Sequence, residues 1–259
     1  MSHSPLQLLL LFLVSIVAGT MNALAGGGTL LTFPALLAAG VPPVVANATN
    51  TVALVPGSLS AGWGFRDEIG TPTRPVIAVL LASCIAGGLV GAWLVVMAGD
   101  ALFRALVPWL IFAATALFLV QEPLRHWRER RSATAAPREL DQANLWVLTA
   151  GQFVVAVYGG FFGAGMGILM LAELGLVGLT NIHQMNGLKN LGALCINGIA
   201  AVYFAVGRHV RWPLVALMAV GSVLGGYAGA WLAQRIGERL VRAVIIAIGL
   251  GMGAWMLVK

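Results

Sequence analysis

The stretch GTMNALAGGGTLLTFPALLAAGVPPVVANATNT, residues 19–51, decides the fold that we expect for this chain. Three consecutive glycines, Gly26 to Gly28, interrupt an apolar run, and the polar cluster Asn47 to Thr51 follows further on. Each glycine inside a helix costs roughly 1 kcal/mol relative to alanine, so three in a row predict a break. A broken helix is tolerated inside a membrane only where its freed backbone is buried in protein or lines a cavity.

A second stretch with the same layout lies downstream, with GGFFGAGMG starting at Gly159 and NGLKN starting at Asn186. Three positions recur as the same residue type at one constant offset: Gly26 as Gly165, Gly28 as Gly167, and Asn47 as Asn186. In addition, GGLVGAWL at residues 87–94 returns as GGYAGAWL at residues 225–232. Repeated halves of this kind are typical of secondary transporters, whose substrate site lies where the repeats meet.

The composition predicts an integral membrane protein. Hydrophobic residues make up 59% of the chain and charged residues 9%, whereas a soluble domain carries roughly 25% charged residues. The net charge of +6 fits basic loops that set the membrane topology better than a nucleic-acid partner. The two cysteines lie in separate apolar segments with no metal-ligand pattern, so we expect neither a metal nor any other cofactor.

We expect an all-α polytopic membrane protein of about eight transmembrane helices, arranged as two four-helix repeats whose first helices are broken by glycine. The repeats cover residues 1–120 and 142–259, and a polar linker covers residues 121–141. Each broken helix is either one interrupted span or a helix followed by a re-entrant piece. If it crosses once, lysine and arginine counts predict parallel repeats with the N-terminus, the linker and the C-terminus in the cytoplasm.

The candidate substrate site combines helix starts with polar helix faces. A break at Gly26 to Gly28 leaves a helix start near Thr29, whose free N–H groups favour an anion, and Gly167 does the same in the second half. Two polar faces then follow at i, i+3 and i+4 spacing: Asn47, Asn50 and Thr51, and Asn186, Lys189 and Asn190. The alternatives are close helix packing for the glycines and hydrogen bonds between helices for the polar groups.

Lys189 is the most informative single residue. It is the only lysine before the C-terminal one and lies within an apolar segment, where an ionisable group is a functional candidate by default. Its partner is either a substrate anion or Glu173, the acid within a span of the second half. Glu173 is therefore either a structural ion-pair partner or the carrier of a coupling proton. The sequence has no catalytic constellation, so we do not expect an enzyme.

These features together resemble the TauE/SafE sulfite exporter family, also described as the 4-toluene sulfonate uptake permease family. The resemblance covers the chain apart from the linker, although the second half reads GAGMG where the first reads GGG. It implies a permease of the bacterial or archaeal inner membrane that moves small sulfur-containing anions. The residues that it implies for the anion path are Gly26, Gly27, Gly28, Asn47, Thr49, Asn50, Gly165, Gly167, Asn186 and Lys189.

We therefore predict a secondary transporter that exports sulfite or organosulfonates, driven by the proton-motive force. Its expected partners are the small anion and the lipid bilayer, with a homo-oligomer as a further option and no nucleic acid. A passive anion channel would need the same residues, and a non-transporting membrane scaffold would not need Lys189 for flux.

Overall fold

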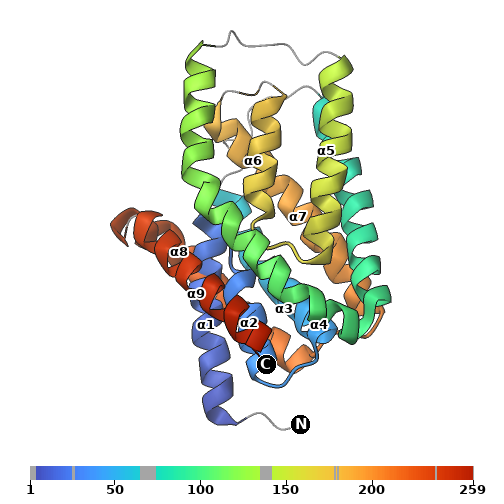
Figure 1. Ribbon diagram of the computed structural model, residues 1–259, viewed down its shortest axis with the longest axis vertical. Helices are drawn as coiled ribbons and strands as arrows, with labels where there is room; N and C mark the ends of the chain where they lie inside the picture. Colours follow the sequence, from blue (N-terminus) through green and yellow to red (C-terminus); the bar gives the residue numbers. More distant parts are fainter. Residues whose placement is uncertain are drawn as a thin grey trace.

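The computed structural model describes residues 4–24, 27–64, 74–134, 142–177, 179, 181–236 and 238–258. In these residues the regular secondary structure is α-helical, with no strand, which confirms the all-α prediction. The helices are α1 (Pro5–Leu24), α2 (Thr29–Ala38), α3 (Pro43–Gly64), α4 (Arg74–Thr134), α5 (Gln142–Phe161), α6 (Met166–Leu176), α7 (Ile182–Val206), α8 (Trp212–Ile236) and α9 (Glu238–Val258). Figure 1 shows the short helices α2 and α6 within a bundle of longer ones.

Several of these helices are suited to a membrane. Among the described residues, three apolar stretches are long enough to cross one: Pro5–Asn22, Ile77–Val120 and Gln184–Val206. Shorter apolar helices accompany them in α2, α5, α6, α8 and α9. The stretch Ile77–Val120 contains a sharp kink at Gly99, whose φ of 69° is a left-handed conformation that glycine adopts readily. The chain is a multi-pass membrane protein.

The broken helix of the second half is a hairpin. A β-carbon added at Gly151 of α5 would lie 2.7 Å from Oε1 of Glu173 on α6, and one at Gly159 would lie 2.7 Å from Sδ of Met166. Because residue numbers rise along α5 as they fall along α6, the two helices are antiparallel. The reversal uses Gly163 and Gly165, both with a positive φ, so α6 is the re-entrant alternative and not the continuation of a single span.

The first half folds back in the same way. A β-carbon added at Gly28 would lie 2.6 Å from the carbonyl oxygen of Ala18, and the Gly28 N–H donates to Oδ1 of Asn22 at 2.9 Å. The two hairpins touch each other through Phe33 of α2 and Phe162 beside α6, whose rings meet edge to face with centroids 5.5 Å apart. Aromatic pairs prefer this geometry, so the inner ends of both hairpins are fixed together.

The repeats are inverted, and the expectation of parallel repeats is wrong. The second part of α4 and α9 are equivalent elements of the two halves, because Leu102 and Arg104 recur as Leu240 and Arg242. They pack antiparallel: Phe112 of α4 lies against Gly253 of α9, and Thr115 lies against Gly249. Equivalent helices that run in opposite directions are related by a pseudo-twofold axis in the membrane plane.

The inversion also corrects the predicted sidedness. In Figure 1 the start of α1 and the end of α9 lie toward one end of the molecule, and the helix ends that border the linker lie at the opposite end. The described helix ends next to the two termini and next to the linker therefore do not lie together, although the predicted sidedness requires that they do. The charge count assumed that each broken helix crosses once, whereas a hairpin returns to the side from which it started.

Each hairpin packs against a helix of the other half. Gly87 and Gly91 of α4 let that helix approach the backbone of α5 near Phe153 and Val157, and Gly225 of α8 approaches the backbone of α1 at Ile16. These glycines come from the duplicated GGxxGAWL segments. Small residues that allow such close contact are a common way of joining helices in a membrane. The glycine-rich segments therefore hold the two halves together.

Candidate functional site

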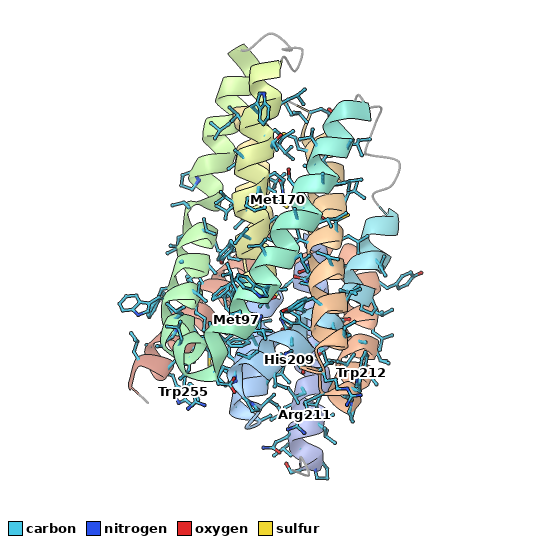
Figure 2. The ribbon with its side chains drawn as sticks, turned by 90° about the vertical axis from the view of Figure 1, so that its right-hand side faces the viewer. Met97, Met170, His209, Arg211, Trp212 and Trp255 are labelled. Atoms are coloured by element: carbon cyan, nitrogen blue, oxygen red, sulfur yellow. The ribbon has the colours of Figure 1, made fainter. Side chains whose placement is uncertain are left out.

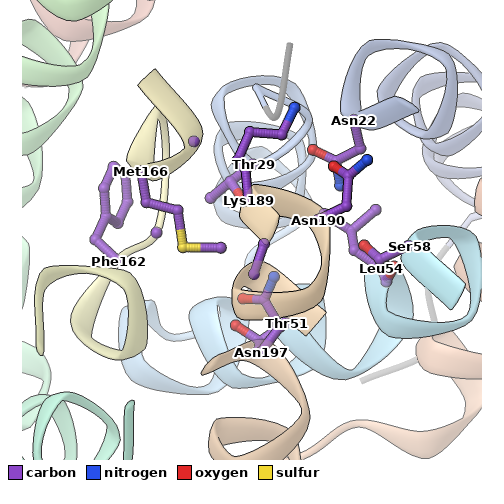
Figure 3. A pocket seen from close by; sticks show the side chains of 13 residues that line it. Asn22, Thr29, Thr51, Leu54, Ser58, Phe162, Met166, Lys189, Asn190 and Asn197 are labelled. Atoms are coloured by element: carbon purple, nitrogen blue, oxygen red, sulfur yellow. Dashed lines mark hydrogen bonds between the residues drawn. The ribbon is translucent and has the colours of Figure 1, made fainter. Parts of the chain in front are cut away.

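A cavity of about 50 Å³ lies where the two hairpins meet α3 and α7. A water molecule needs roughly 10–15 Å³ of cavity volume. The cavity therefore has room for about three to five waters or for a small oxyanion. Figure 3 shows polar side chains gathered on one side of it and the apolar Phe162 and Met166 on the other. Its lining residues are Asn22, Thr29, Thr51, Leu54, Ser58, Phe162, Gly163, Met166, Gly167, Lys189, Asn190, Ala193 and Asn197.

The cavity lies across the pseudo-twofold axis. Three of its residues on α3 have their repeat equivalents on α7, at the offset that relates Asn47 to Asn186: Thr51 and Asn190, Leu54 and Ala193, and Ser58 and Asn197. Within each helix the three positions follow at i, i+3 and i+7, so they form one face. The two halves therefore contribute matching walls, as the sequence repeats predict for a site at their interface.

Lys189 gives this symmetric cavity an asymmetric charge. Only 7% of its surface is exposed, and within the described part of the chain it has neither a hydrogen bond nor a salt bridge. Its repeat equivalent is the neutral Asn50, which donates to Oγ1 of Thr29 at 3.3 Å and accepts from Thr32. A buried ammonium without a partner is costly. The cavity is therefore a place where an anion would be stabilised.

The turns of the two hairpins also differ, and again it is the second half that has a donor without an acceptor. In the first half, Asn22 accepts the Gly28 N–H, whereas Phe161 occupies the equivalent position in the second half. Among the described residues the N–H of Gly167, the equivalent of Gly28, has no acceptor. A backbone N–H at the start of a helix is a natural anion donor. Gly167 and Lys189 therefore leave donors free on the second-half side of the cavity.

The structure gathers some of the predicted site residues at the cavity and separates others from it. Those on the lining are Thr29, Thr51, Gly167, Lys189 and Asn190. Asn50 does not line the cavity itself, but it donates a hydrogen bond to Thr29, which does. Off the lining are Gly27, Gly28, Asn47, Thr49, Gly165 and Asn186. Gly26 lies outside the described residues.

Three of the residues off the lining have structural contacts instead. Asn47 donates through Nδ2 to the carbonyl oxygen of Phe161 at 3.1 Å, which ties α3 to α5. Thr49 accepts the Arg211 N–H at 3.1 Å. Gly27 lies against the ring of Phe118, where a β-carbon would be only 2.5 Å from Cζ. These contacts fit the alternative that we gave for the polar faces and glycines, namely bonding and packing between helices.

Glu173 is apart from the cavity. It is 8% exposed, lies against Gly151 of α5, and makes no salt bridge with Lys189 among the described residues. Both of its carboxyl oxygens are buried without a hydrogen-bond partner in that part of the chain. The structure therefore gives no support to the ion-pair alternative for these two residues.

Sequence reasoning missed three polar lining residues, Asn22, Ser58 and Asn197. Asn22 precedes the glycine run, and only the fold-back of α2 brings it to the cavity. Ser58 and Asn197 could have been found, because they continue the faces of Thr51 and Asn190 by two helical turns and are repeat equivalents. The apolar lining of Leu54, Phe162 and Met166 carries no sequence signal distinct from that of a core.

An inverted pair of hairpins around a buried cavity is an arrangement that many membrane transporters share. Comparisons with known proteins agree. The family model described as "Sulfite exporter TauE/SafE" matches residues 11–256. A "probable membrane transporter protein" of Haemophilus influenzae is 30% identical over 96% of this chain and 94% of its own length. The "probable membrane transporter protein YfcA" of Escherichia coli K12 is 32% identical over 98% and 91% respectively.

The chain belongs to the TauE/SafE sulfite exporter family. A more distant relative, the "probable membrane transporter protein ORF9" of a Sinorhizobium species, is 26% identical over 95% of this chain and 91% of its own length. No solved structure matches the chain. The relatives are named as transporters, which fits a protein that is not an enzyme.

Proposed function

We propose that this protein is a secondary transporter of small sulfur-containing oxyanions, such as sulfite or organosulfonates. The observation that carries the proposal is Lys189, a buried cation at the cavity between the hairpins for which the described part of the chain supplies no partner. In water-excluded surroundings, an oxyanion that accepts from its ammonium group replaces the missing partner. The N–H of Gly167 and the amide of Asn190 supply further donors.

The lining favours an anion that has a compact charged group and tolerates an apolar one. Sulfite has four non-hydrogen atoms, which suits a cavity with room for about three to five waters. Leu54, Phe162 and Met166 offer apolar contact to the carbon chain of an organosulfonate. The inverted hairpins supply two equivalent walls whose alternate opening exposes the anion to either side, with the proton-motive force driving export.

We further propose that the linker faces the cytoplasm of a bacterial cell and that both termini lie on the outer face of its inner membrane. If α3, both parts of α4, and α7 to α9 each cross once, ten basic residues lie on the linker side: Arg66, Arg74, Arg125, Arg128, Arg130, Arg131, Arg138, Arg235, Arg239 and Arg242. Four lie on the other side: Arg104, Arg208, Arg211 and Lys259. An excess of basic residues marks the cytoplasmic face.

Flux into proteoliposomes that contain the purified protein tests the transport proposal. Sulfite, an organosulfonate and sulfate are compared with and without a proton gradient, using the wild type, Lys189→Met and Lys189→Arg. Hydrogen bonds to a charged group contribute about 1.5–3 kcal/mol, so we expect Lys189→Met to weaken apparent affinity roughly tenfold to a hundredfold. Lys189→Arg keeps the charge and retains part of the flux.

The competing functions give different results in the same assay. Saturable sulfite flux that responds to the gradient and falls in Lys189→Met supports the transporter. Linear flux that ignores the gradient indicates a passive channel. Wild-type protein that moves none of the anions, or Lys189→Met with unchanged flux, contradicts the proposal and leaves the scaffold alternative.

A further inference from the structure

We propose that the carboxyl group of Glu173 is the proton-binding site that couples transport to the proton gradient, in a cluster separate from the anion cavity. The inference rests on the proposed transport function, and it assigns the proton to one residue and its neighbours. Three observations support the inference. Glu173 is buried, both of its carboxyl oxygens lack a hydrogen-bond partner in the described part of the chain, and the equivalent position of the first repeat holds no acid.

Glu173 belongs to a buried polar cluster at the junction of four helices. Gln152 of α5 is fully buried and donates through Nε2 to Sγ of Cys84 on α4 at 3.3 Å, while its Oε1 has no partner in the described part of the chain. Cys84 is also close enough to Glu173 on α6 and Cys195 on α7 to interact with them electrostatically. Figure 2 labels Met170, which lies one turn before Glu173 on α6, well away from the end where Arg211 and Trp212 lie.

The groups that face Glu173 provide no compensating positive charge. From α4 the neighbouring titratable group is the thiol of Cys84, which in turn lies near Cys195 of α7, and from α5 the neighbour is the backbone of Gln152. The cation of α7, Lys189, lines the cavity and makes no salt bridge with Glu173 among the described residues. An isolated carboxylate in such surroundings takes up a proton instead of remaining charged. In our proposal Glu173 is therefore protonated in this arrangement.

The fold does not need this cluster. At the offset that relates the two repeats, the residue equivalent to Glu173 in the first repeat is Pro34, and the residue equivalent to Gln152 is Leu13. Pro34 is buried in α2 at the matching place of the first hairpin. Since the first hairpin has apolar residues at both of these positions, the acid and the amide in the second half are an addition to the shared fold. A buried ionisable group that packing does not require is a functional candidate.

Two helices connect the proton cluster to the anion cavity. The helix α6 carries Met166 and Gly167 on the cavity and Glu173 two turns further on. The helix α7 carries Lys189 and Asn190 on the cavity, while Gly192 lies against Cys84 and Met170. Any movement of the α5–α6 hairpin that opens the cavity therefore also changes the surroundings of Glu173.

This connection specifies the coupling step. When the hairpin moves and water reaches Glu173, its O–H bond breaks, and the proton leaves to the solvent on one side of the membrane. The hairpin then returns with the carboxylate, which is the costly half of the cycle, and a proton from the other side re-forms the O–H bond. One proton is thereby moved for each cycle of the hairpin, and the anion crosses in the same cycle.

The test is Glu173→Gln in proteoliposomes loaded with a pH-sensitive dye, using sulfite as the probe. Glutamine resembles the protonated acid in shape and charge, so the variant should fold. Two quantities are measured: sulfite exchange without a gradient, and proton movement that accompanies net sulfite flux. The matched control is Asp100→Asn, which removes the exposed acid beside the α4 kink but keeps the Oδ1 that accepts the Val44 N–H at 2.8 Å.

We expect Glu173→Gln to exchange sulfite within about threefold of wild type while its proton movement is lost, whereas Asp100→Asn retains both. Proton movement that persists in Glu173→Gln overturns the inference, and so does wild-type sulfite transport without proton movement. In either case the anion-transport proposal survives. A wild type that does not move sulfite contradicts the proposed function itself.

A second measurement needs no variant. An apolar carbodiimide adds to protonated carboxyl groups in apolar surroundings, and mass spectrometry of the treated wild type in lipid identifies the modified residue. We expect modification at Glu173 and not at Asp100, together with loss of proton-coupled flux. Absence of label at Glu173 overturns the inference even if Glu173→Gln fails to fold.

Discussion

At the scale of single residues, small differences between the repeats distinguish the residues that we propose for function from those that hold the fold. Asn50 and Lys189 are equivalent positions, but Asn50 is engaged by Thr29 and Thr32, whereas Lys189 has no partner in the described part of the chain. The helices α3 and α7 that carry them both present polar residues at equivalent positions of the cavity. We propose that this one cation, in an otherwise neutral pair of walls, makes the cavity selective for anions.

Asn190 and Asn186 allow a matched test at this scale. Both are asparagines near the start of α7, but Asn190 lines the cavity and Asn186 does not. A hydrogen bond from a neutral amide contributes about 0.5–1.5 kcal/mol. Asn190→Ala should therefore raise the KM for sulfite in proteoliposomes roughly twofold to tenfold.

Asn186→Ala is the companion variant, and its KM should stay near the wild-type value. Equal effects of the two substitutions on KM would mean that the cavity is not where the anion binds.

Part of the site was predictable from residue types alone. Lys189, Asn190 and Thr51 were named because ionisable and polar groups in an apolar segment are costly, and Thr29 and Gly167 because a glycine break leaves a helix start there. All five line the cavity. The sequence could not separate them from Asn47 and Thr49, which share the same polar clusters. That distinction depends on which carbonyl or N–H from a distant helix reaches each side chain, and the spacing along one helix does not contain this information.

At the scale of helices, the glycine runs have two different uses. Those at the hairpins reverse the chain, and those of the GGxxGAWL segments bring helices of opposite halves into contact. The break itself was predictable from helix propensity. Its geometry was not, because a broken span and a re-entrant hairpin have the same composition and differ only in what each short helix packs against.

The packing role predicts a stability effect for Gly91. A β-carbon there would overlap the Val157 carbonyl of α5, which is backbone and cannot rotate away. Overpacking of this kind costs about 1–3 kcal/mol. Gly91→Ala should therefore lower the melting temperature of the detergent-solubilised protein.

Gly251→Ala is the control for that measurement, because Gly251 on α9 has nothing within 4 Å of an added β-carbon. Alanine is favoured over glycine within a helix by roughly 0.5–1 kcal/mol, so this variant should melt at or above the wild-type temperature. If Gly91→Ala is as stable as Gly251→Ala, close contact between α4 and α5 is not what joins the halves.

At the scale of the whole molecule, the duplication could be recognised in the sequence, but the relative orientation of the two halves could not. The nearly constant offset between matching segments identifies equivalent positions and says nothing about direction. Direction depends on the number of crossings in each half, which the hairpins change by one. The structure supplies it through α4 and α9, equivalent helices that pack antiparallel.

Inversion predicts that the two ends of the first repeat face opposite sides of the membrane. Single cysteines at Ser4→Cys, before α1, and Ser132→Cys, near the end of α4, are introduced after the native Cys84 and Cys195 have been replaced. A membrane-impermeant maleimide added to intact cells should label Ser4→Cys. It should label Ser132→Cys only after the membrane has been permeabilised. Labelling of both positions from one side would contradict the inverted arrangement.

We propose that the two hairpins enclose one anion beside Lys189. Selenite has the pyramidal shape of sulfite, and its selenium atom scatters X-rays anomalously, so a crystal of the protein soaked in selenite locates the bound anion. We expect one anomalous peak per chain within hydrogen-bonding distance of Lys189 Nζ and of the Asn190 side chain. A peak elsewhere in the chain, or none from protein that transports selenite in proteoliposomes, would contradict it.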